Sequence, residues 1–375
     1  MKKIAIVTAS YAPISTPRAF RATELAREFA RRGDAVTVYN CTTVLGVEPI
    51  KENGNIKIIN LKARYYSMYG KQAKAIKNKL LLKLVRWAKK KLFYFTTSTW
   101  LLYLRAIQKR LVLEDRYDLL ISVGLPFTIH WGVAQKIKRE QVAKCCVADY
   151  GDPFSKFNLN LRVAKYFQWI ERSAIKRFDY ISVPTPFAIE SYSWLKKTTQ
   201  IVVIPQGFNF SEVKLSAYIP NKVPTFIYAG IFYSDIRNPK KLFDFLVQLD
   251  FDFRFIIYTS VSLQDSYMCI APYLEKLKGR LLVYDFIPRL TLIEEMSKVD
   301  FIININNTST NQIPSKLIDY ALSKRPIFSC SPDVIDTSRF LAFCKNNYDG
   351  QDIIDIDSFD IRNVVDQFYS LLRDN

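Results

Sequence analysis

The stretch that decides the fold is Asn304-Ile-Asn-Asn-Thr-Ser-Thr-Asn-Gln-Ile-Pro-Ser-Lys-Leu-Ile-Asp-Tyr-Ala-Leu-Ser-Lys-Arg-Pro326. It follows the apolar run Phe301–Ile303 and precedes a second apolar run that begins at Ile327. This order predicts a strand, a polar loop, a helix and a further strand, which is the repeating pattern of a parallel α/β sheet. Pro314 suits the first position of the helix, where a missing N–H removes no hydrogen bond.

The predicted helix start has the chemistry of an anion site. Ser315 and Lys316 follow Pro314 directly. A helix N-terminus offers free N–H groups and a positive partial charge, which suit a phosphate, and Lys316 adds a full charge. Asp319 lies more than a turn further on, where its carboxylate would accept hydrogen bonds from a ribose. The alternative is an ordinary capped helix of an α/β domain.

This block resembles the donor-binding segment of GT-B glycosyltransferases, specifically the retaining family 4. Those enzymes carry two acidic residues separated by seven positions. Asp319 matches the second and Asn311 stands at the first, so one carboxylate is missing. The run from Pro314 to Tyr320 matches a variant found in bacterial cell-surface members. The resemblance covers essentially the whole chain and implies an α/β GT-B fold, with two doubly wound Rossmann-like domains facing a cleft.

Composition sets the class of protein. A chain of 375 residues, 49% of them hydrophobic, is long enough for two domains with separate cores. The six cysteines have no metal-ligand spacing and suit reduced thiols in a cytoplasmic protein. The single histidine excludes a His-rich metal site, so no metal or cofactor is expected beyond a nucleotide-sugar substrate. No uncharged apolar run reaches transmembrane length, which predicts a soluble or peripheral protein.

Alternating strand and helix patterns divide the chain into two α/β sets. Residues 1–207 are predicted to form an N-terminal, acceptor-side Rossmann-like domain, and residues 208–350 a donor-binding domain. Residues 351–375 are predicted to carry a last helix which, by the resemblance, crosses back to the first domain. Gln206–Pro224 lacks periodicity and is interpreted as the linker. Predicted strands are Lys3–Thr8, Ala35–Tyr39, Ile56–Leu61, Leu119–Val123, Ala143–Ala148, Tyr180–Val183, Ile201–Ile204, Thr225–Ala229, Phe253–Tyr258, Leu281–Tyr284, Phe301–Ile305 and Pro326–Ser329.

The net charge of +19 is concentrated in one segment. Between Lys62 and Arg110 there are fourteen Lys or Arg residues and no Asp or Glu. On a helical wheel one narrow face carries Lys79, Lys83, Arg86 and Lys90, opposite a half rich in leucine and tryptophan. A basic face opposite an apolar face is typical of a helix that lies in an anionic membrane surface. The alternative is a solvated helix that packs its apolar half on the domain core. Nucleic acid is not expected as a partner, because no nucleic-acid-binding module is present.

Four polar residues follow strands of the first domain. Arg18 lies in the first turn after strand one, and it would reach an anionic ligand or be solvated. His130 opens a helix, where the resemblance implies contact with the transferred sugar and the alternative is a packed neutral imidazole. Asp149 and Asp152 follow another strand end, and either would position an acceptor hydroxyl. For Asp152 the alternative is a turn initiated by aspartate.

In the second domain the resemblance implies a grip on the donor diphosphate. Gly230 ends the first strand, and Arg237, Lys240 and Lys241 follow in the loop and helix start. Arginine suits this role because its planar fork binds phosphate oxygens in pairs. Ile287, in the loop after a later strand, would lie beside the nucleotide base through backbone contacts.

The sequence therefore predicts a retaining, metal-independent glycosyltransferase. It would move a sugar from a nucleotide-diphosphate donor to a hydroxyl of a lipid-linked or membrane-presented glycan, at the inner face of the cell membrane. Arg237, Lys241 and His130 are the predicted catalytic residues. Two other classes stay open: a non-catalytic GT-B scaffold, which Asn311 in place of a carboxylate favours, and a nucleotide-sugar 2-epimerase, which a single histidine disfavours.

Overall fold

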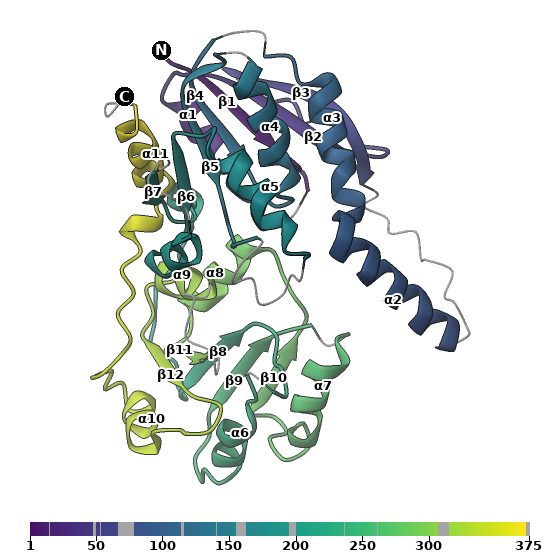
Figure 1. Cartoon of the computed structure of the whole chain (residues 1–375). Coiled ribbons are helices and arrows are strands. Elements are labelled where there is room, and N and C mark those ends of the chain that lie inside the picture. Colours follow the sequence, from purple (N-terminus) through teal and green to yellow (C-terminus); the bar gives the residue numbers. More distant parts are fainter. Residues whose placement is uncertain are drawn as a thin grey trace. The chain divides into compact units, whose positions relative to one another are not determined.

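The chain folds into two compact units, which are described separately. Unit 1 comprises Met1–Phe208 with Ser358–Asn375, and unit 2 comprises Asn209–Asp357. The computed structural model describes residues 1–14, 16–47, 50–52, 54–66, 79–113, 116–139, 141–154, 163–194, 200–235, 237–260, 262–306 and 315–372. In each unit helices flank a parallel sheet (Figure 1).

Unit 1 contains a seven-stranded sheet in the order β3-β2-β1-β4-β5-β6-β7. Every neighbouring pair of its strands is parallel. Parallel sheets are covered on both faces, which is why the run from Ile4 to Val7 is apolar throughout and fully buried. The strands are β1 (Lys3–Thr8), β2 (Ala35–Val44), β3 (Ile56–Tyr66), β4 (Tyr117–Val123), β5 (Ala143–Asp149), β6 (Tyr180–Val183) and β7 (Gln200–Val203).

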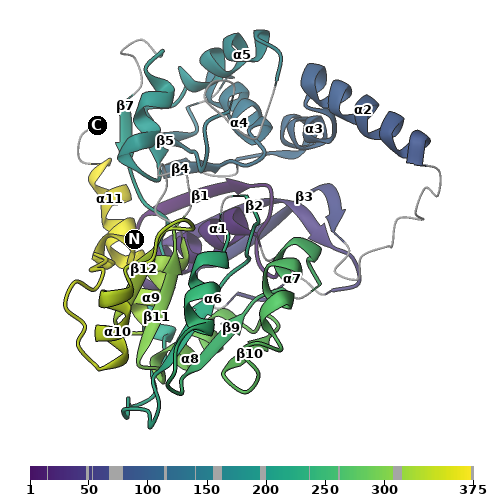
Figure 2. The same cartoon turned by 90° about the horizontal axis from the view of Figure 1, so that it is seen from below.

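Helices cover both faces of this sheet (Figure 2). One face packs against buried residues of α3, α4 and α5, and the other against α1 and α11. The helices are α1 (Pro17–Arg31), α2 (Lys79–Thr96), α3 (Leu101–Arg110), α4 (Thr128–Arg139), α5 (Tyr166–Ile175) and α11 (Ile361–Ser370).

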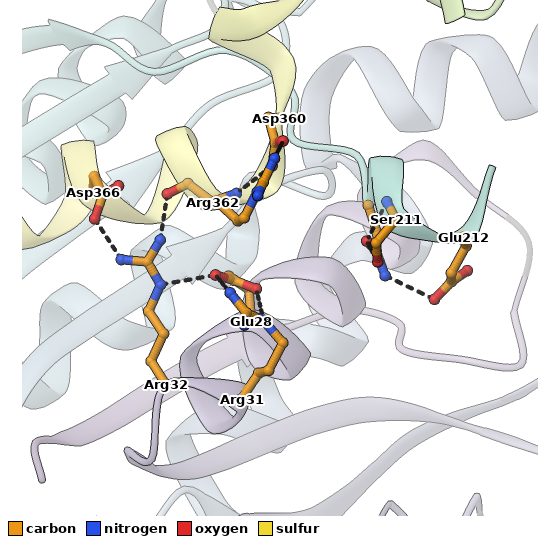
Figure 3. A network of polar contacts seen from close by, with 9 residues as sticks. Glu28, Arg31, Arg32, Ser211, Glu212, Asp360, Arg362 and Asp366 are labelled. Atoms are coloured by element: carbon orange, nitrogen blue, oxygen red, sulfur yellow. Dashed lines mark hydrogen bonds and ion pairs between the residues drawn. The ribbon is translucent and has the colours of Figure 1, made fainter. Parts of the chain in front are cut away.

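The last helix, α11, is part of unit 1 although it follows unit 2 in the chain. Phe368 packs edge-on against Phe29 of α1, with ring centroids 6.4 Å apart. A polar network joins the same two helices at the surface (Figure 3). Buried Glu28 accepts hydrogen bonds from Arg31 and Arg32, and Arg32 in turn donates to the Arg362 carbonyl at 2.6 Å. Apolar packing and charge pairing therefore both fix α11 on α1.

Unit 2 contains a five-stranded parallel sheet in the order β10-β9-β8-β11-β12. Its core is rich in phenylalanine, and Phe226 stacks with Phe301 at 4.9 Å. The strands are β8 (Thr225–Ala229), β9 (Arg254–Tyr258), β10 (Leu281–Tyr284), β11 (Phe301–Ile305) and β12 (Ile327–Cys330). The helices are α6 (Lys240–Val247), α7 (Gln264–Ile270), α8 (Arg289–Ser297), α9 (Ser315–Leu322) and α10 (Thr337–Cys344).

Each sheet has one point where the strand order reverses. In unit 1 it lies between β1 and β4, and in unit 2 between β8 and β11. At such a point the helices that follow the two strands lie on opposite faces, so the carboxyl ends of the strands are left open to a ligand. A ligand site is therefore expected at one or both of these edges.

The prediction of two doubly wound α/β sets is confirmed. Five predicted strands coincide with the observed ones to the residue, among them Tyr180–Val183 and Thr225–Ala229. Two short helices, α7 and α10, were not predicted, since seven or eight residues carry too little periodicity to separate a helix from a loop.

Candidate functional site

The edge of unit 2 at the β8–β11 reversal is organised by Tyr320 of α9. Its buried hydroxyl donates to the Ala229 carbonyl at 2.7 Å, and the Ala229 N–H lies 3.3 Å from the same oxygen. Because Ala229 is the last residue of β8, these bonds hold the first turns of α9 against the end of that strand. Lys316 lies one helical turn before Tyr320 and is therefore directed to the same edge.

Lys316 is a half-buried cation at this edge. Its Nζ donates to the Ile305 carbonyl at 3.2 Å and lies 5.3 Å from the centroid of the Tyr228 ring. Within the described part of the chain no carboxylate pairs with it. Burial, together with the positive charge of Arg237, lowers the pKa of Lys316 to about 7. The ammonium group therefore lacks the counter-ion that a bound anion would supply.

Arg237 approaches the same place from the loop after β8. Its Nη1 donates to the Ile231 carbonyl at 3.3 Å, and its side chain hydrogen-bonds the hydroxyl of Tyr228. Gly230 lies between, with φ +145°, a backbone conformation that favours glycine. A Cβ at Gly230 would lie 3.2 Å from the Tyr228 hydroxyl oxygen and 3.8 Å from Arg237 Nη1. The structure thus brings Gly230, Arg237 and Lys316 together around one tyrosine.

The other two predicted cations lie elsewhere on α6. The ammonium of Lys240 pairs with Asp244 of the same helix at 2.6 Å and is exposed. Lys241 is exposed as well. The described residues give neither side chain a contact with Arg237 or Lys316. Ile287 lies half-buried in the loop between β10 and α8.

Asp319 is ion-paired within unit 2. Arg289, the first residue of α8, donates through Nε to Asp319 Oδ1 at 2.8 Å. Burial raises the pKa of Asp319, and the charge of Arg289 opposes that rise. Ser315 is the first residue of α9. Asn311 lies outside the described residues, so its predicted place in the donor loop stays a prediction.

In unit 1, Arg18 and Asp149 meet at the β1–β4 reversal. Arg18 donates to the Asp149 carbonyl at 2.8 Å and pairs with its carboxylate. Arg21 is fully buried and donates to Oδ1 of the same carboxylate at 2.9 Å, and Ser182 donates to that oxygen at 2.8 Å. Burial alone would raise the pKa of Asp149, but the charges of Arg18 and Arg21 hold it well below its usual range.

The carboxylate predicted to position an acceptor is therefore held inside unit 1 by two guanidinium groups. Sequence reasoning did not assign a role to Arg21 or Ser182. Arg18 and Arg21 lie three residues apart on a helix, which places them on one face, but their shared partner is 128 residues from Arg21 in the chain. Asp152 lies just beyond, with an exposed side chain.

His130 is buried beside this cluster. Its Nδ1 lies 2.7 Å from the Ser122 hydroxyl, and its ring stacks on Tyr150 at 4.3 Å. Burial, with the nearby charge of Arg18, lowers the pKa of His130 to about 3, so the imidazole is neutral at physiological pH. Its Nε2 has no hydrogen-bond partner among the described residues and faces Gly124, where a Cβ would lie 2.4 Å away.

Comparison with known proteins supports the fold. No family model and no curated protein matches the sequence. Among solved structures, sucrose-phosphate synthase from Thermosynechococcus elongatus matches with a TM-score of 0.62 at 14% identity, over 100% of this chain and 99% of that one. HepE of Anabaena in complex with UDP matches with a TM-score of 0.59 at 12% identity, over 100% of both chains. The lipopolysaccharide outer core galactosyltransferase WaaB matches with a TM-score of 0.54 at 12% identity, over 99% and 96%.

At sequence identities this low, structural similarity shows a shared fold and nothing more specific. The chain has the fold of the GT-B glycosyltransferases, which confirms the fold class predicted from the sequence.

The Asp149 cluster should be essential to the stability of unit 1. Asp149→Ala leaves Arg18 and Arg21 without their shared counter-ion, so the free energy of unfolding of unit 1 should fall by about 3–5 kcal/mol. Urea denaturation followed by circular dichroism measures the change. Asp152→Ala, at an exposed neighbouring position, is the control and should be nearly neutral. An Asp149→Ala protein as stable as the parent would refute the structural role.

Affinity for an anionic ligand at the unit 2 edge should depend on pH. A bound anion would favour protonated Lys316 and raise its pKa from about 7. Binding of such an anion should therefore be strongest below pH 7. Above pH 7 it should weaken by about tenfold per unit until the pKa of the complex is reached. Titration calorimetry between pH 6 and 9 measures this, and Lys316→Gln should remove the slope. The same slope in Lys316→Gln would assign the titration to another group.

Proposed function

We propose that the protein is a glycosyltransferase that binds a nucleotide-diphosphate sugar at the β8–β11 edge of unit 2. The observation that carries this proposal is the convergence of Arg237 and Lys316 on Tyr228 and Gly230. Two cations held close together repel each other, and the burial of Lys316 adds a desolvation cost. A diphosphate placed between the two cations would offset both their mutual repulsion and the desolvation cost.

The solved structures with this fold give further support. HepE of Anabaena was solved with UDP and with UDP-glucose, and WaaB is named as a galactosyltransferase. Those ligands and activities belong to those proteins. The resemblance of the Pro314-to-Tyr320 block extends the same class of donor to this chain as part of the proposal.

The chemistry proposed is departure of a stabilised nucleoside diphosphate with retention at the sugar carbon. Arg237, Lys316 and the start of α9 at Ser315 neutralise the charge that develops on the leaving phosphate. Lys240 and Lys241 contribute at longer range from α6. The leaving phosphate helps to deprotonate the acceptor hydroxyl on the front face, so that no protein nucleophile is needed. The roles that the resemblance gives to His130 toward the transferred sugar, and to Arg18 and Asp152 toward the acceptor, are part of the proposal.

The acceptor is proposed to be a lipid-linked or membrane-presented glycan, reached from the cytoplasmic face of an anionic membrane. Four apolar side chains of α2 are more than half exposed: Leu84, Trp87, Leu92 and Phe95. For these four the alternative, packing on the domain core, does not hold. The C-terminal end of α2 is fixed to unit 1, since the Tyr94 carbonyl accepts from Ala164 N–H at 3.0 Å. The helix extends outward from that end (Figure 1).

An exposed apolar stripe on a helix within the acid-free segment is the pattern of an interfacial anchor. In the described part of the chain, no helix combines the length and the hydrophobicity that crossing a bilayer requires.

Removing either donor-site cation should weaken the binding of nucleoside diphosphates selectively. Arg237→Ala and Lys316→Ala should each cost about 1.5–3 kcal/mol, the range for a hydrogen bond to a charged group. The corresponding nucleoside should bind almost unchanged, because it lacks the phosphates. Calorimetry with UDP, GDP and ADP and their nucleosides makes the comparison.

Lys276→Ala, an exposed lysine elsewhere in unit 2, is the matched control and should leave binding unchanged. Equal losses for diphosphate and nucleoside would place the site elsewhere or indicate misfolding. A wild-type protein that binds none of the three diphosphates would favour the non-catalytic scaffold.

Binding to anionic bilayers should depend on the basic face of the α2 segment. Replacing Lys79, Lys83, Arg86 and Lys90 with Gln should reduce co-sedimentation with phosphatidylglycerol vesicles, since each basic residue near the surface contributes about 1 kcal/mol. Binding that remains should be less sensitive to salt. Turnover on a short water-soluble acceptor should be retained.

The control replaces four exposed lysines of unit 2, Lys222, Lys276, Lys278 and Lys345, with Gln, which changes the net charge equally. If the two variants lose vesicle binding to the same extent, total charge and not the α2 segment drives it. No vesicle binding by the wild type at low salt would end the membrane proposal.

A further inference from the structure

The Arg289–Asp319 pair connects two parts of unit 2 that lie side by side in the fold but thirty residues apart in the chain. Arg289 is the first residue of α8 and follows directly on the loop that contains Ile287. Asp319 lies on α9, one turn after Lys316 and next to Tyr320, which holds α9 at the strand end. The pair therefore joins the β10–α8 loop to the helix that carries the donor-site cation.

The ion pair engages only one of the two carboxylate oxygens of Asp319. Arg289 Nε donates to Oδ1 of Asp319 at 2.8 Å, and Nη2 lies 2.6 Å from that same oxygen. A bidentate pair would engage both carboxylate oxygens, one to each nitrogen. In the described ranges, no hydrogen bond or ion pair involves Oδ2. One carboxylate oxygen is thus held by the guanidinium, and the other keeps its capacity to accept hydrogen bonds.

The charge state of Asp319 also depends on Arg289. Burial raises the pKa of the carboxyl group, and the guanidinium is the nearby cation that opposes this rise. A carboxylate accepts hydrogen bonds from two vicinal hydroxyls better than a neutral acid does, because bonds to an ionised acceptor are shorter and stronger. Arg289 thus both orients the side chain and favours its ionised form.

We propose that Arg289 is a positioning residue that directs Asp319 Oδ2 to the 2′- and 3′-hydroxyls of the donor ribose, and so makes the site selective for ribonucleotides. The inference rests on the proposed donor binding in unit 2 and adds a residue to which neither sequence reasoning nor the resemblance gave a role. The alternative is that the ion pair only stabilises the packing of α8 against α9. Such a structural role would affect every nucleotide equally, whatever its sugar.

The test compares ribose with deoxyribose. UDP, GDP and ADP are each paired with their 2′-deoxy and 3′-deoxy forms, and calorimetry measures binding to the wild type, Arg289→Gln, Arg289→Lys and Asp319→Asn. Arg289→Gln and Asp319→Asn should weaken ribonucleotide binding by about tenfold or more, the loss of one hydrogen bond to a charged group. In both variants the ratio of the affinity for the ribonucleotide to the affinity for its deoxy form should fall toward one. Arg289→Lys keeps the charge and should restore part of the preference.

Lys298→Gln is the matched control, because Lys298, the residue that caps the C-terminus of α8, forms an exposed ion pair with Glu295 of that helix. It should leave affinity and ribose preference unchanged. Thermal unfolding followed by circular dichroism verifies that each variant is folded. An equal loss for ribo- and deoxyribonucleotides in Arg289→Gln would assign Arg289 a structural role and overturn the proposal.

The failure of this inference is separable from failure of the proposed function. If the wild type binds none of the three diphosphates, the donor site itself is refuted, and with it the role of Arg289. If the wild type binds a diphosphate without preferring ribose, or if Arg289→Gln keeps that preference, only the role of Arg289 is refuted.

Discussion

Parallel strands leave a protein few places in which polar side chains from several elements can meet. Seven strands in unit 1 and five in unit 2 run in parallel and carry helices on both faces, so the sheet faces are filled with apolar side chains. The carboxyl edge remains, and it is open where the strand order reverses. Arg18, Asp149 and His130 gather at one reversal, and Arg237, Lys316 and Asp319 at the other. The candidate chemistry follows from this constraint.

The two edges differ in whether their charged side chains have a partner of opposite charge. In unit 1 the Asp149 carboxylate is matched by Arg18, Arg21 and Ser182, so the charge is neutralised within the protein. In unit 2 Lys316 is half-buried near Arg237, and the described residues provide it with a carbonyl and aromatic rings. A matched cluster leaves no buried charge without a partner, whereas an unmatched cation costs stability until an anion binds. This difference is one reason why we propose the donor site in unit 2.

The basic segment that contains α2 has a separate feature, which is a set of exposed apolar side chains. Apolar side chains of α2 remain exposed although unit 1 already has a core on that side of its sheet. Burial of such side chains normally favours folding, so exposing four of them on one helix carries a cost. A bilayer surface would remove that cost, and the absence of acidic residues from Lys62 to Arg110 removes the repulsion that an anionic surface would otherwise exert.

Much of the fold was predictable from local pattern, because strand and helix periods depend on residues that are neighbours in sequence. The run Thr225–Ala229 correctly predicted a strand, and the Pro-Ser-Lys run predicted the helix on which Lys316 lies. Short helices such as α10 were missed, since eight residues hold little periodicity. Tertiary structure alone decided which charges pair: Arg21 with Asp149 across 128 residues, and Arg289 with Asp319 across thirty. Periodicity identifies which side of an element faces the core, but it contains no information on which distant side chain will lie opposite.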